Sequence, residues 1–245
     1  MLPFPLFCSF LNNALKTLIK RIPLLRKLIY QSLLWFRENT VGINGAGNKI
    51  IADGAQLERC RININGSGNS LHFAPGCSVK DCQIEIIGDN HILVVKENVV
   101  LTQSILWFED HNCTISIGAG TTMQRNGHIA VTEPFRKIMI GNDCMFSFSV
   151  DIRNGDSHTI YNKADNTRVN WAKDIQIGNH VWLGAYSQVI GGADIGQDSI
   201  IGIRSLVNKK IPNSSIAVGI PARAVKSGFS WDSVRWKNGD PVLQS

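Results

Sequence analysis

The sequence predicts an all-β solenoid, in which similar coils stack on one another around one long core. Three observations support this fold class. Apolar residues recur at every sixth position late in the chain, asparagines recur every 21 or 22 residues before that, and glycine is frequent, with 22 among 245 residues. Repeated units that cannot bury their own apolar face must stack to do so. The 3.6-residue period of a helical bundle is absent from residue 40 onward.

Charge sets the first 37 residues apart from the rest of the chain. The net charge is +6, and this segment contains six basic residues and no acidic one. The remaining chain carries 19 basic and 19 acidic residues and is therefore balanced. We do not expect a basic surface for nucleic acid, because the excess charge belongs to an N-terminal element.

Residues 1–40 predict a basic, amphipathic, helical extension, in which Pro23 separates two short helices. Its apolar residues share faces at helical spacing. A stripe of this kind within residues 9–37 suits peripheral contact with an anionic membrane, and it equally suits packing on the solenoid or on a neighbouring subunit; both roles remain open. No uncharged run is long enough to span a bilayer, and we expect no signal peptide. We therefore expect a cytoplasmic protein, with peripheral attachment at the inner membrane face as the alternative.

Asparagine marks the repeated units in the first half of the solenoid. Asn48, Asn69, Asn90 and Asn112 are 21, 21 and 22 residues apart, and an apolar run follows each of them. In a strand, alternate side chains point to the same face. We expect these apolar residues to point inward: Ile50; Leu71 with Phe73; Ile92 with Val94; and Ile115 with Ile117.

A strict six-residue period follows. An unbroken series predicts the core: Ile177, Leu183, Val189, Ile195, Ile201 and Val207. An earlier series, Ile140, Phe146 and Ile152, has the same spacing. Glycine follows the apolar residue at 178, 184, 196 and 202, which suits a sharp corner where a side chain would collide with the turn.

The six cysteines do not form a recognisable metal or disulfide motif. They lie at positions 8, 60, 77, 82, 113 and 144, and no C-x-x-C pair occurs among them. No Cys/His spacing fits a zinc site, so we predict no metal. We expect buried free thiols, as in the reducing cytosol.

Three strings carry a resemblance to a known family: "NGDSHTIY", "IGNHVWLG" and "VGIPARAVK". The hexapeptide series resembles the left-handed parallel β-helix of the hexapeptide acyltransferases. Residues 140–226 resemble the galactoside, maltose and xenobiotic acetyltransferase branch of that superfamily. Together with the upstream repeats, this resemblance predicts a β-helix over residues 41–228. Residues 159–174 break the period and form the expected active-site loop, and residues 229–245 form a tail. The resemblance also implies acetyl-CoA as acyl donor and a homotrimer with active sites between adjacent subunits.

His158 is the candidate catalytic residue. It follows Ile140, Phe146 and Ile152 at the next sixth position, and the chain then leaves the repeat for a polar loop. Histidine suits the removal of a hydroxyl proton because its unperturbed pKa lies near neutrality. His158 matches the family's catalytic base, and Asp156 could orient its ring.

The other histidines are expected to be structural. Strand alternation places His72 and His91 outward, and His180 reads as an exposed turn residue. We identify no partner for His111 or His128.

Further site positions follow from the resemblance. Trp182, 24 residues after His158, matches a tryptophan that shapes the substrate cleft. Ala185 matches a position where a small residue lets the pantetheine arm approach, and its N–H is a candidate donor to the thioester oxygen. The resemblance implies further contacts with CoA at Ile203, Asn208, Lys209, Arg223 and Lys226, where cations suit the phosphates.

The predicted function is O-acetyl transfer from acetyl-CoA to a sugar hydroxyl, in a surface polysaccharide or a lipid-linked glycan. A zinc enzyme built on the same solenoid would need two histidines close in sequence, and no H-x-x-x-x-H pair exists. Two alternatives remain: an N-acyltransferase acting on an amino sugar, and a non-catalytic solenoid that binds a partner.

Overall fold

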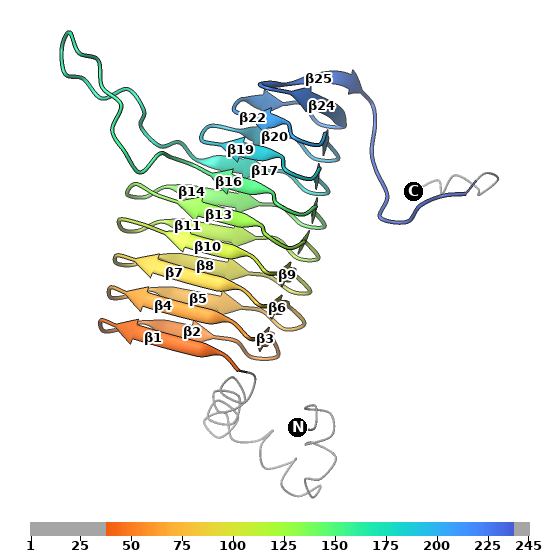
Figure 1. Ribbon diagram of the computed structural model, residues 1–245. Helices are drawn as coiled ribbons and strands as arrows, with labels where there is room; N and C mark the ends of the chain where they lie inside the picture. Colours follow the sequence, from red (N-terminus) through yellow and green to blue (C-terminus); the bar gives the residue numbers. More distant parts are fainter. Residues whose placement is uncertain (1–37, 238–245) are drawn as a thin grey trace, which may run out of the picture.

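The computed structural model describes residues 38–237 as a three-sided parallel β-solenoid (Figure 1). Every regular element in this range is a strand, so the predicted all-β class is confirmed. The predicted helical extension within residues 1–37 and the end of the tail lie outside the described residues. In the range that the structure covers, no helix is long and apolar enough to cross a membrane.

Three sheets form the sides of the solenoid, and each coil contributes one strand to each sheet. Sheet A contains β1 (Thr40–Asn44), β4 (Arg61–Asn65), β7 (Gln83–Ile87), β10 (Ile105–Phe108), β13 (His128–Val131), β16 (Asp151–Arg153), β19 (Gln188–Ile190) and β22 (Leu206–Val207). Sheet B contains β2 (Lys49–Ile51), β5 (Ser70–Phe73), β8 (Ile92–Val95), β11 (Thr114–Ile117), β14 (Lys137–Ile140), β17 (Ile175–Ile177), β20 (Asp194–Ile195) and β23 (Lys210–Ile211).

Sheet C closes the third side and carries the only antiparallel strand pair among residues 38–237. It contains β3 (Gln56–Glu58), β6 (Ser78–Lys80), β9 (Val100–Thr102), β12 (Thr122–Met123), β15 (Met145–Phe146), β18 (Trp182–Leu183), β21 (Ile200–Ile201), β24 (Ser215–Gly219) and β25 (Ala222–Ser227). We call the three lines of turns the A/B, B/C and C/A edges, after the sheets that each line joins. A side chain on an edge therefore stacks between its equivalents in the two neighbouring coils.

The core follows the six-residue series, as predicted. All six of its members, from Ile177 to Val207, are buried, with exposed fractions of 0% or 1%. Phe146 and Ile152 of the earlier series are equally buried, and Ile140 is 5% exposed. The apolar side chains of all three sheets thus fill one continuous interior.

Glycine occupies the corners because successive coils approach closely there. A Cβ atom at Gly178 would lie 2.6 Å from the backbone nitrogen of Gln197, and one at Gly184 would lie 2.7 Å from that of Ile203. Each of these nitrogens belongs to the next coil. The predicted collision is therefore with the neighbouring coil, and any side chain would force the two coils apart.

The predicted equivalence of the four asparagines is wrong by one residue in two of the four units. Strand pairing aligns Asn48 with Asn69, then with His91 and Cys113. Asn90 and Asn112 instead precede these positions and adopt left-handed turn conformations, with φ of 56° each. The inward residues of the third unit are accordingly Leu93 and Val95, whereas Ile92 and Val94, which we predicted to be inward, face outward.

His91 is buried, contrary to the expectation that it faces solvent, whereas His72 is exposed as predicted. The N–H of His91 donates to the Asn69 side-chain oxygen at 2.8 Å, and its ring Nδ1 accepts from the N–H of Cys113 at 3.2 Å. Nε2 lies 3.3 Å from the carbonyl oxygen of Ile87. This is a neutral histidine in a buried ladder, and burial lowers its pKa.

Five cysteines are buried free thiols, as predicted, and Cys8 lies outside the described residues. Burial raises the pKa of Cys82 to about 12, so its thiol stays protonated at neutral pH. The five are Cys60, Cys77, Cys82, Cys113 and Cys144.

Candidate active site

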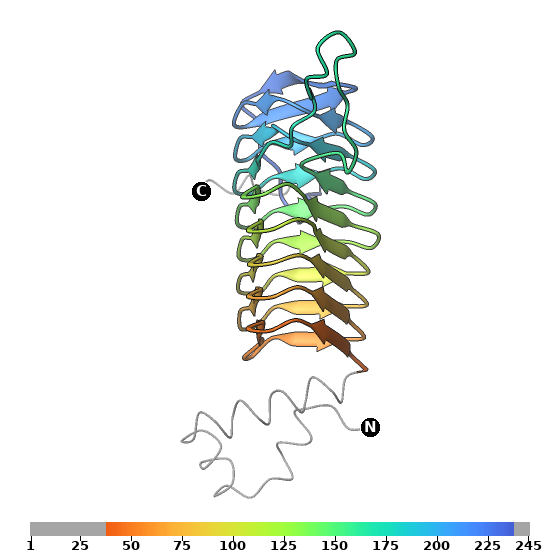
Figure 2. The ribbon, with the colours of Figure 1, turned by 90° about the vertical axis from the view of Figure 1, so that its left-hand side faces the viewer.

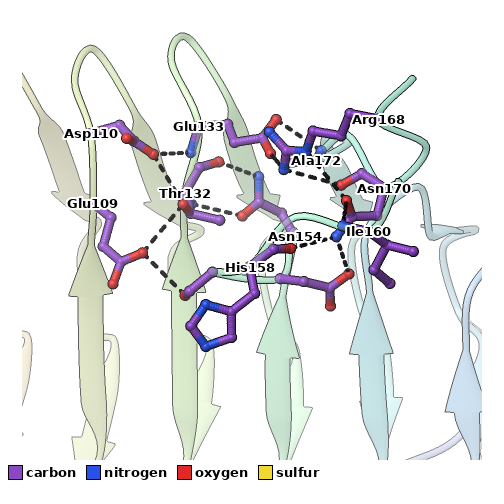
Figure 3. A network of polar contacts seen from close by, with 12 residues as sticks. Glu109, Asp110, Thr132, Glu133, Asn154, His158, Ile160, Arg168, Asn170 and Ala172 are labelled. Atoms are coloured by element: carbon purple, nitrogen blue, oxygen red, sulfur yellow. Dashed lines mark hydrogen bonds and ion pairs between the residues drawn. The ribbon is translucent and has the colours of Figure 1, made fainter. Parts of the chain in front are cut away.

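His158 lies on a long excursion at the A/B edge, between β16 and β17. The excursion projects from the side of the solenoid (Figures 1 and 2). The His158 side chain is exposed, and no polar contact drawn in Figure 3 reaches its imidazole. Among the described residues, the ring has no hydrogen-bond partner, so both nitrogens remain available to a substrate.

Asn170 holds the backbone around His158. Its side-chain nitrogen donates to the carbonyl oxygen of His158 at 2.8 Å and to Asp156 Oδ2 at 3.1 Å. Its side-chain oxygen accepts from the N–H of Ile160 at 2.8 Å. Asp156 therefore bonds to Asn170, and no bond joins it to the His158 ring within residues 38–237. Its orienting role stays a prediction, whereas Asn170, which the sequence did not indicate, positions the main chain.

Glu133 anchors the returning arm of the excursion to the coil below (Figure 3). One carboxylate oxygen pairs with Arg168, and the other accepts from the N–H of Ala172 at 2.9 Å. The Arg168 guanidinium also lies 4.3 Å from the ring centre of Trp171. Glu133 is itself held, because its N–H donates to Asp110 Oδ2 at 2.7 Å.

Glu109 anchors the outgoing arm, one coil lower again. Its Oε2 accepts from the Ser157 hydroxyl at 3.2 Å and from the Thr132 hydroxyl at 3.4 Å. Its Oε1 accepts from Trp107 Nε1 at 3.0 Å. Since Ser157 immediately precedes His158, carboxylates of two lower coils fix both sides of the candidate base.

A second group of titratable residues lies beside the excursion, on the outward face of sheet A. His128 Nδ1 is 3.0 Å from Asp151 Oδ1, and Arg153 Nη2 is 2.7 Å from Asp151 Oδ2. Burial alone would raise the pKa of Asp151, but hydrogen bonds from His128 and Arg153 outweigh it and lower that pKa. From the sequence we predicted no partner for His128. The signal was present, because the 23 residues that separate it from Asp151 equal the local coil length.

Trp182, Ala185 and Ile203 lie away from the excursion. Trp182 faces outward on sheet C, with 37% of its surface exposed and its ring 6.2 Å from that of Trp231. Ala185 and Ile203 occupy equivalent C/A-edge turns, because the strands before them pair residue by residue. Within the described chain, the N–H of each has no hydrogen-bond acceptor, as a donor to a bound ligand requires.

The remaining predicted positions lie near the end of the solenoid. Asn208 and Lys209 occupy the A/B edge, two coils beyond His158, and the buried side-chain oxygen of Asn208 has no hydrogen-bond partner among the described residues. Arg223 and Lys226 project from β25 and are exposed, with the Lys226 ammonium 5.6 Å from the centre of the Phe229 ring. One chain thus brings His158, Asn208 and Lys209 to one edge, and Trp182, Ala185 and Ile203 to another side.

The six-residue period of the buried apolar side chains and the stacked glycine corners define a hexapeptide-repeat protein. The family model described as "Bacterial transferase hexapeptide (six repeats)" matches residues 174–209. The polysialic acid O-acetyltransferase of Neisseria meningitidis is 34% identical over 151 residues, which cover 62% of this chain and 68% of that protein. A polysialic acid O-acetyltransferase of Escherichia coli O1:K1 is 32% identical over 117 residues, which cover 48% of this chain and 38% of its relative.

Two crystal structures match most of the solenoid. The polysialic acid O-acetyltransferase OatWY is 29% identical, with a TM-score of 0.76, over 80% of this chain and 93% of that one. The polySia-specific acetyltransferase NeuO is 27% identical, with a TM-score of 0.74, over 80% and 90%. The chain belongs to the hexapeptide-repeat acetyltransferases.

Proposed function

We propose that this protein transfers an acetyl group from acetyl-CoA to a hydroxyl of a surface polysaccharide, with a sialic acid polymer as the acceptor to test first. The observation that carries the proposal is the match to two polysialic acid O-acetyltransferases over four fifths of the chain. The exposed His158 ring, which has no hydrogen-bond partner in the described chain, supplies the base that such a transfer requires.

In the proposed reaction, His158 takes the proton from the acceptor hydroxyl while the oxygen attacks the acetyl carbonyl. A C–O bond forms and the C–S bond breaks, and His158 returns the proton to the departing thiolate. The N–H of Ala185 suits the negatively charged oxygen of the tetrahedral intermediate, because a fixed backbone donor costs little reorganisation. Asn170 holds the main chain of His158 throughout, through its bond to the carbonyl oxygen.

The predicted donor positions fit acetyl-CoA by their chemistry. The buried oxygen of Asn208 lacks a donor in the structure, as expected of an atom that meets a ligand. Lys209, Arg223 and Lys226 are exposed cations, which suit phosphate groups. When bound, the donor supplies the acetyl thioester.

We propose that two copies of the chain complete each site, within a homotrimer. His158 lies on the A/B edge, whereas Trp182 lies on sheet C and Ala185 on the C/A edge. A neighbouring copy that turned its C/A edge toward the His158 excursion would unite them. Sedimentation would check the number of copies, and mixing His158→Ala with Ala185→Trp subunits should restore part of the activity that each lacks.

The localisation proposed from the sequence is cytoplasmic, with peripheral contact at the inner membrane face through residues 9–37. The basic, acid-free composition of that segment supports attraction to anionic lipid. Flotation with vesicles of phosphatidylcholine and phosphatidylserine should carry the full chain upward, and deletion of residues 1–37 should abolish this. Unchanged flotation and unchanged glycan acetylation after the deletion would contradict the membrane role.

The decisive experiment measures release of free thiol from acetyl-CoA, with and without polysialic acid. Acceptor-dependent release should fall about 100- to 10,000-fold in His158→Ala. His72→Ala, which changes an exposed histidine in a lower coil, is the matched control and should retain full activity. Equal release from wild type and His158→Ala would refute the assigned base, and no release from wild type with this acceptor would refute the proposed substrate.

A further inference from the structure

A hollow lies on the outward face of sheet A, directly beside the His158 excursion. Its volume is about 340 Å³, and Trp107, His128, Ala130, Arg153 and Ser157 are among its lining residues. Pockets for small ligands begin near this size. The hollow is therefore large enough for one sugar residue, and Ser157 connects it to the candidate base along the chain.

The hollow exists because of a small side chain between two large ones. Trp107, Ala130 and Arg153 are register partners on β10, β13 and β16, so they form one outward column across three coils. The methyl group of Ala130 leaves the floor open between the indole and the guanidinium. A larger residue at this one position would fill the space without touching the core, since the side chain faces outward.

Trp107 provides a fixed aromatic wall. Its Nε1 donates to Glu109 Oε1, which sets the orientation of the ring, and the indole is only partly buried. An amphipathic aromatic ring of this kind packs on the apolar face of a ligand while polar groups around it choose the ligand's orientation. The C–H face of a pyranose ring is such a surface.

The hollow offers two kinds of polar group. The carboxylates of Glu109 and Asp156 can accept hydrogen bonds from sugar hydroxyls. The guanidinium of Arg153 turns back along β16 to Asp151, and its side chain is 48% exposed. Asp151 engages its Nε and Nη2, which leaves further N–H donors directed away from that pair. A guanidinium with free donors suits a carboxylate.

We infer, on the basis of the proposed function, that this hollow binds one acidic sugar residue of the acceptor glycan, stacked on Trp107 with its carboxylate at Arg153. The bound residue lies next to the sugar that receives the acetyl group at His158. His128 is a positioning residue: its Nδ1 bonds to Asp151, which in turn orients Arg153. The hollow thus selects a charged polymer over a neutral one, and it holds the chain in place between transfers.

Calorimetric titration with two probes, polysialic acid and the neutral polymer dextran, tests this binding without requiring catalysis. Wild type should bind the former only. Trp107→Ala should weaken binding about 10-fold, and Arg153→Gln should weaken it about 10- to 100-fold. Ala130→Leu should abolish it by filling the floor, and circular dichroism with sedimentation would verify that the fold and assembly are intact. Ile105→Ala is the matched control, because Ile105 is an exposed residue on β10, the strand of Trp107, and does not line the hollow.

The outcomes separate this inference from the proposed function. Weaker binding of polysialic acid in Trp107→Ala and Arg153→Gln and its loss in Ala130→Leu, with unchanged affinity for acetyl-CoA and an unchanged control, support the hollow as the glycan subsite. Wild-type binding and wild-type KM in all three variants would overturn it, while acetyl transfer would still stand. Wild-type protein that binds neither probe, or dextran as well as polysialic acid, would also overturn it. If polysialic acid binding depends on Trp107 and Arg153 but no thiol is released, the proposed reaction would be refuted and the inferred subsite would stand.

Discussion

The lower and upper coils of the solenoid build the same three-sided structure with different spacing. In sheet A, the strand partners of the lower coils are 21 to 23 residues apart, as for Thr40 with Arg61 and His128 with Asp151. In the upper coils, Gln188 and Leu206 are 18 residues apart. From Ile177 to Val207 the upper coils thus follow the six-residue period on each side, whereas the lower coils contain longer strands and turns.

Two kinds of contact fix the register between coils. Glycine corners lie against the next coil in both regions, as Gly178 does against Gln197 and Gly66 against Gly88. The lower coils add a polar ladder, in which Asn48, Asn69 and His91 form hydrogen bonds from coil to coil. A glycine corner in close contact with the next coil cannot accept a larger residue. A ladder position can accept a different residue, provided that its side chain offers an acceptor in the same place.

The largest effect should come from adding one carbon to a glycine corner. Gly178→Ala places a Cβ atom 2.6 Å from the Gln197 backbone nitrogen, and we expect it to lower the free energy of unfolding by about 3 kcal/mol. Gly42→Ala in the first coil is the control, because its Cβ would meet only the Asn63 side-chain oxygen at 3.3 Å. Urea unfolding of both variants gives the comparison. Equal losses would show that close approach of the next coil does not determine the cost of the added carbon.

A smaller effect is expected where a lower coil supports the excursion of an upper one. Glu133→Gln leaves Arg168, a largely buried cation, without its carboxylate, which should cost about 2 kcal/mol. We also expect protease cleavage within residues 159–174 to accelerate and acetyl transfer to fall. Glu58→Gln disrupts the Glu58–Arg59 ion pair, whose side chains are 34% and 44% exposed, and should change little. Unaltered cleavage in Glu133→Gln would mean that the excursion does not depend on this anchor.

The ladder of the lower coils should make stability depend on pH. Burial lowers the pKa of His91 in the folded protein, so the unfolded chain binds a proton first as the pH falls. His91 therefore contributes fully above its unfolded pKa of about 6.5, and stability should be lost below it by up to about 1.4 kcal/mol per pH unit.

His91→Asn introduces the residue that the neighbouring coil has at the equivalent position, Asn69. It should remove the pH dependence of stability while keeping the hydrogen bonds of the ladder. His72→Asn changes an exposed histidine one coil away and should leave the slope as it is. Urea unfolding at pH 5, 6 and 7 would measure the slopes. The same slope in wild type and His91→Asn would assign the acid sensitivity to other groups.

The two regions also explain what could be predicted from the sequence. In the upper coils, one apolar residue in six is enough to identify the core, because each side of the coil has the same length. In the lower coils, Asn90 and Asn112 resemble ladder residues but occupy left-handed turn positions, a conformation that asparagine also favours. A side chain suited to both roles cannot reveal the register without the partner strands.

The same limit applies to the candidate site. His158 could be found because it ends a regular series, and its exposure was implied by the loop that follows. The bonds of His128 to Asp151 and of Glu133 to Arg168 join different coils, so they appear only when each coil length is known. The hollow beside Trp107 depends on two strand registers at once. The contacts of the tail depend on a chain reversal that no repeat indicates.

The smallest expected effect concerns the tail, which adds a third kind of contact to the upper coils. After β25, Trp231 stacks on His180 with ring centres 4.3 Å apart, and its Nε1 donates to the His180 carbonyl oxygen at 2.8 Å. Trp231→Ala removes both contacts and should weaken docking of the tail about 10-fold, with little change in global unfolding, because no core residue is altered. Trp236→Ala is the control, since within the part of the chain that the structure describes the Trp236 side chain bonds only to Asp232 of the tail itself. Trypsin cleavage after Arg235 should accelerate in Trp231→Ala and stay near the wild-type rate in Trp236→Ala; the same rate in both would mean that contact with His180 does not hold the tail.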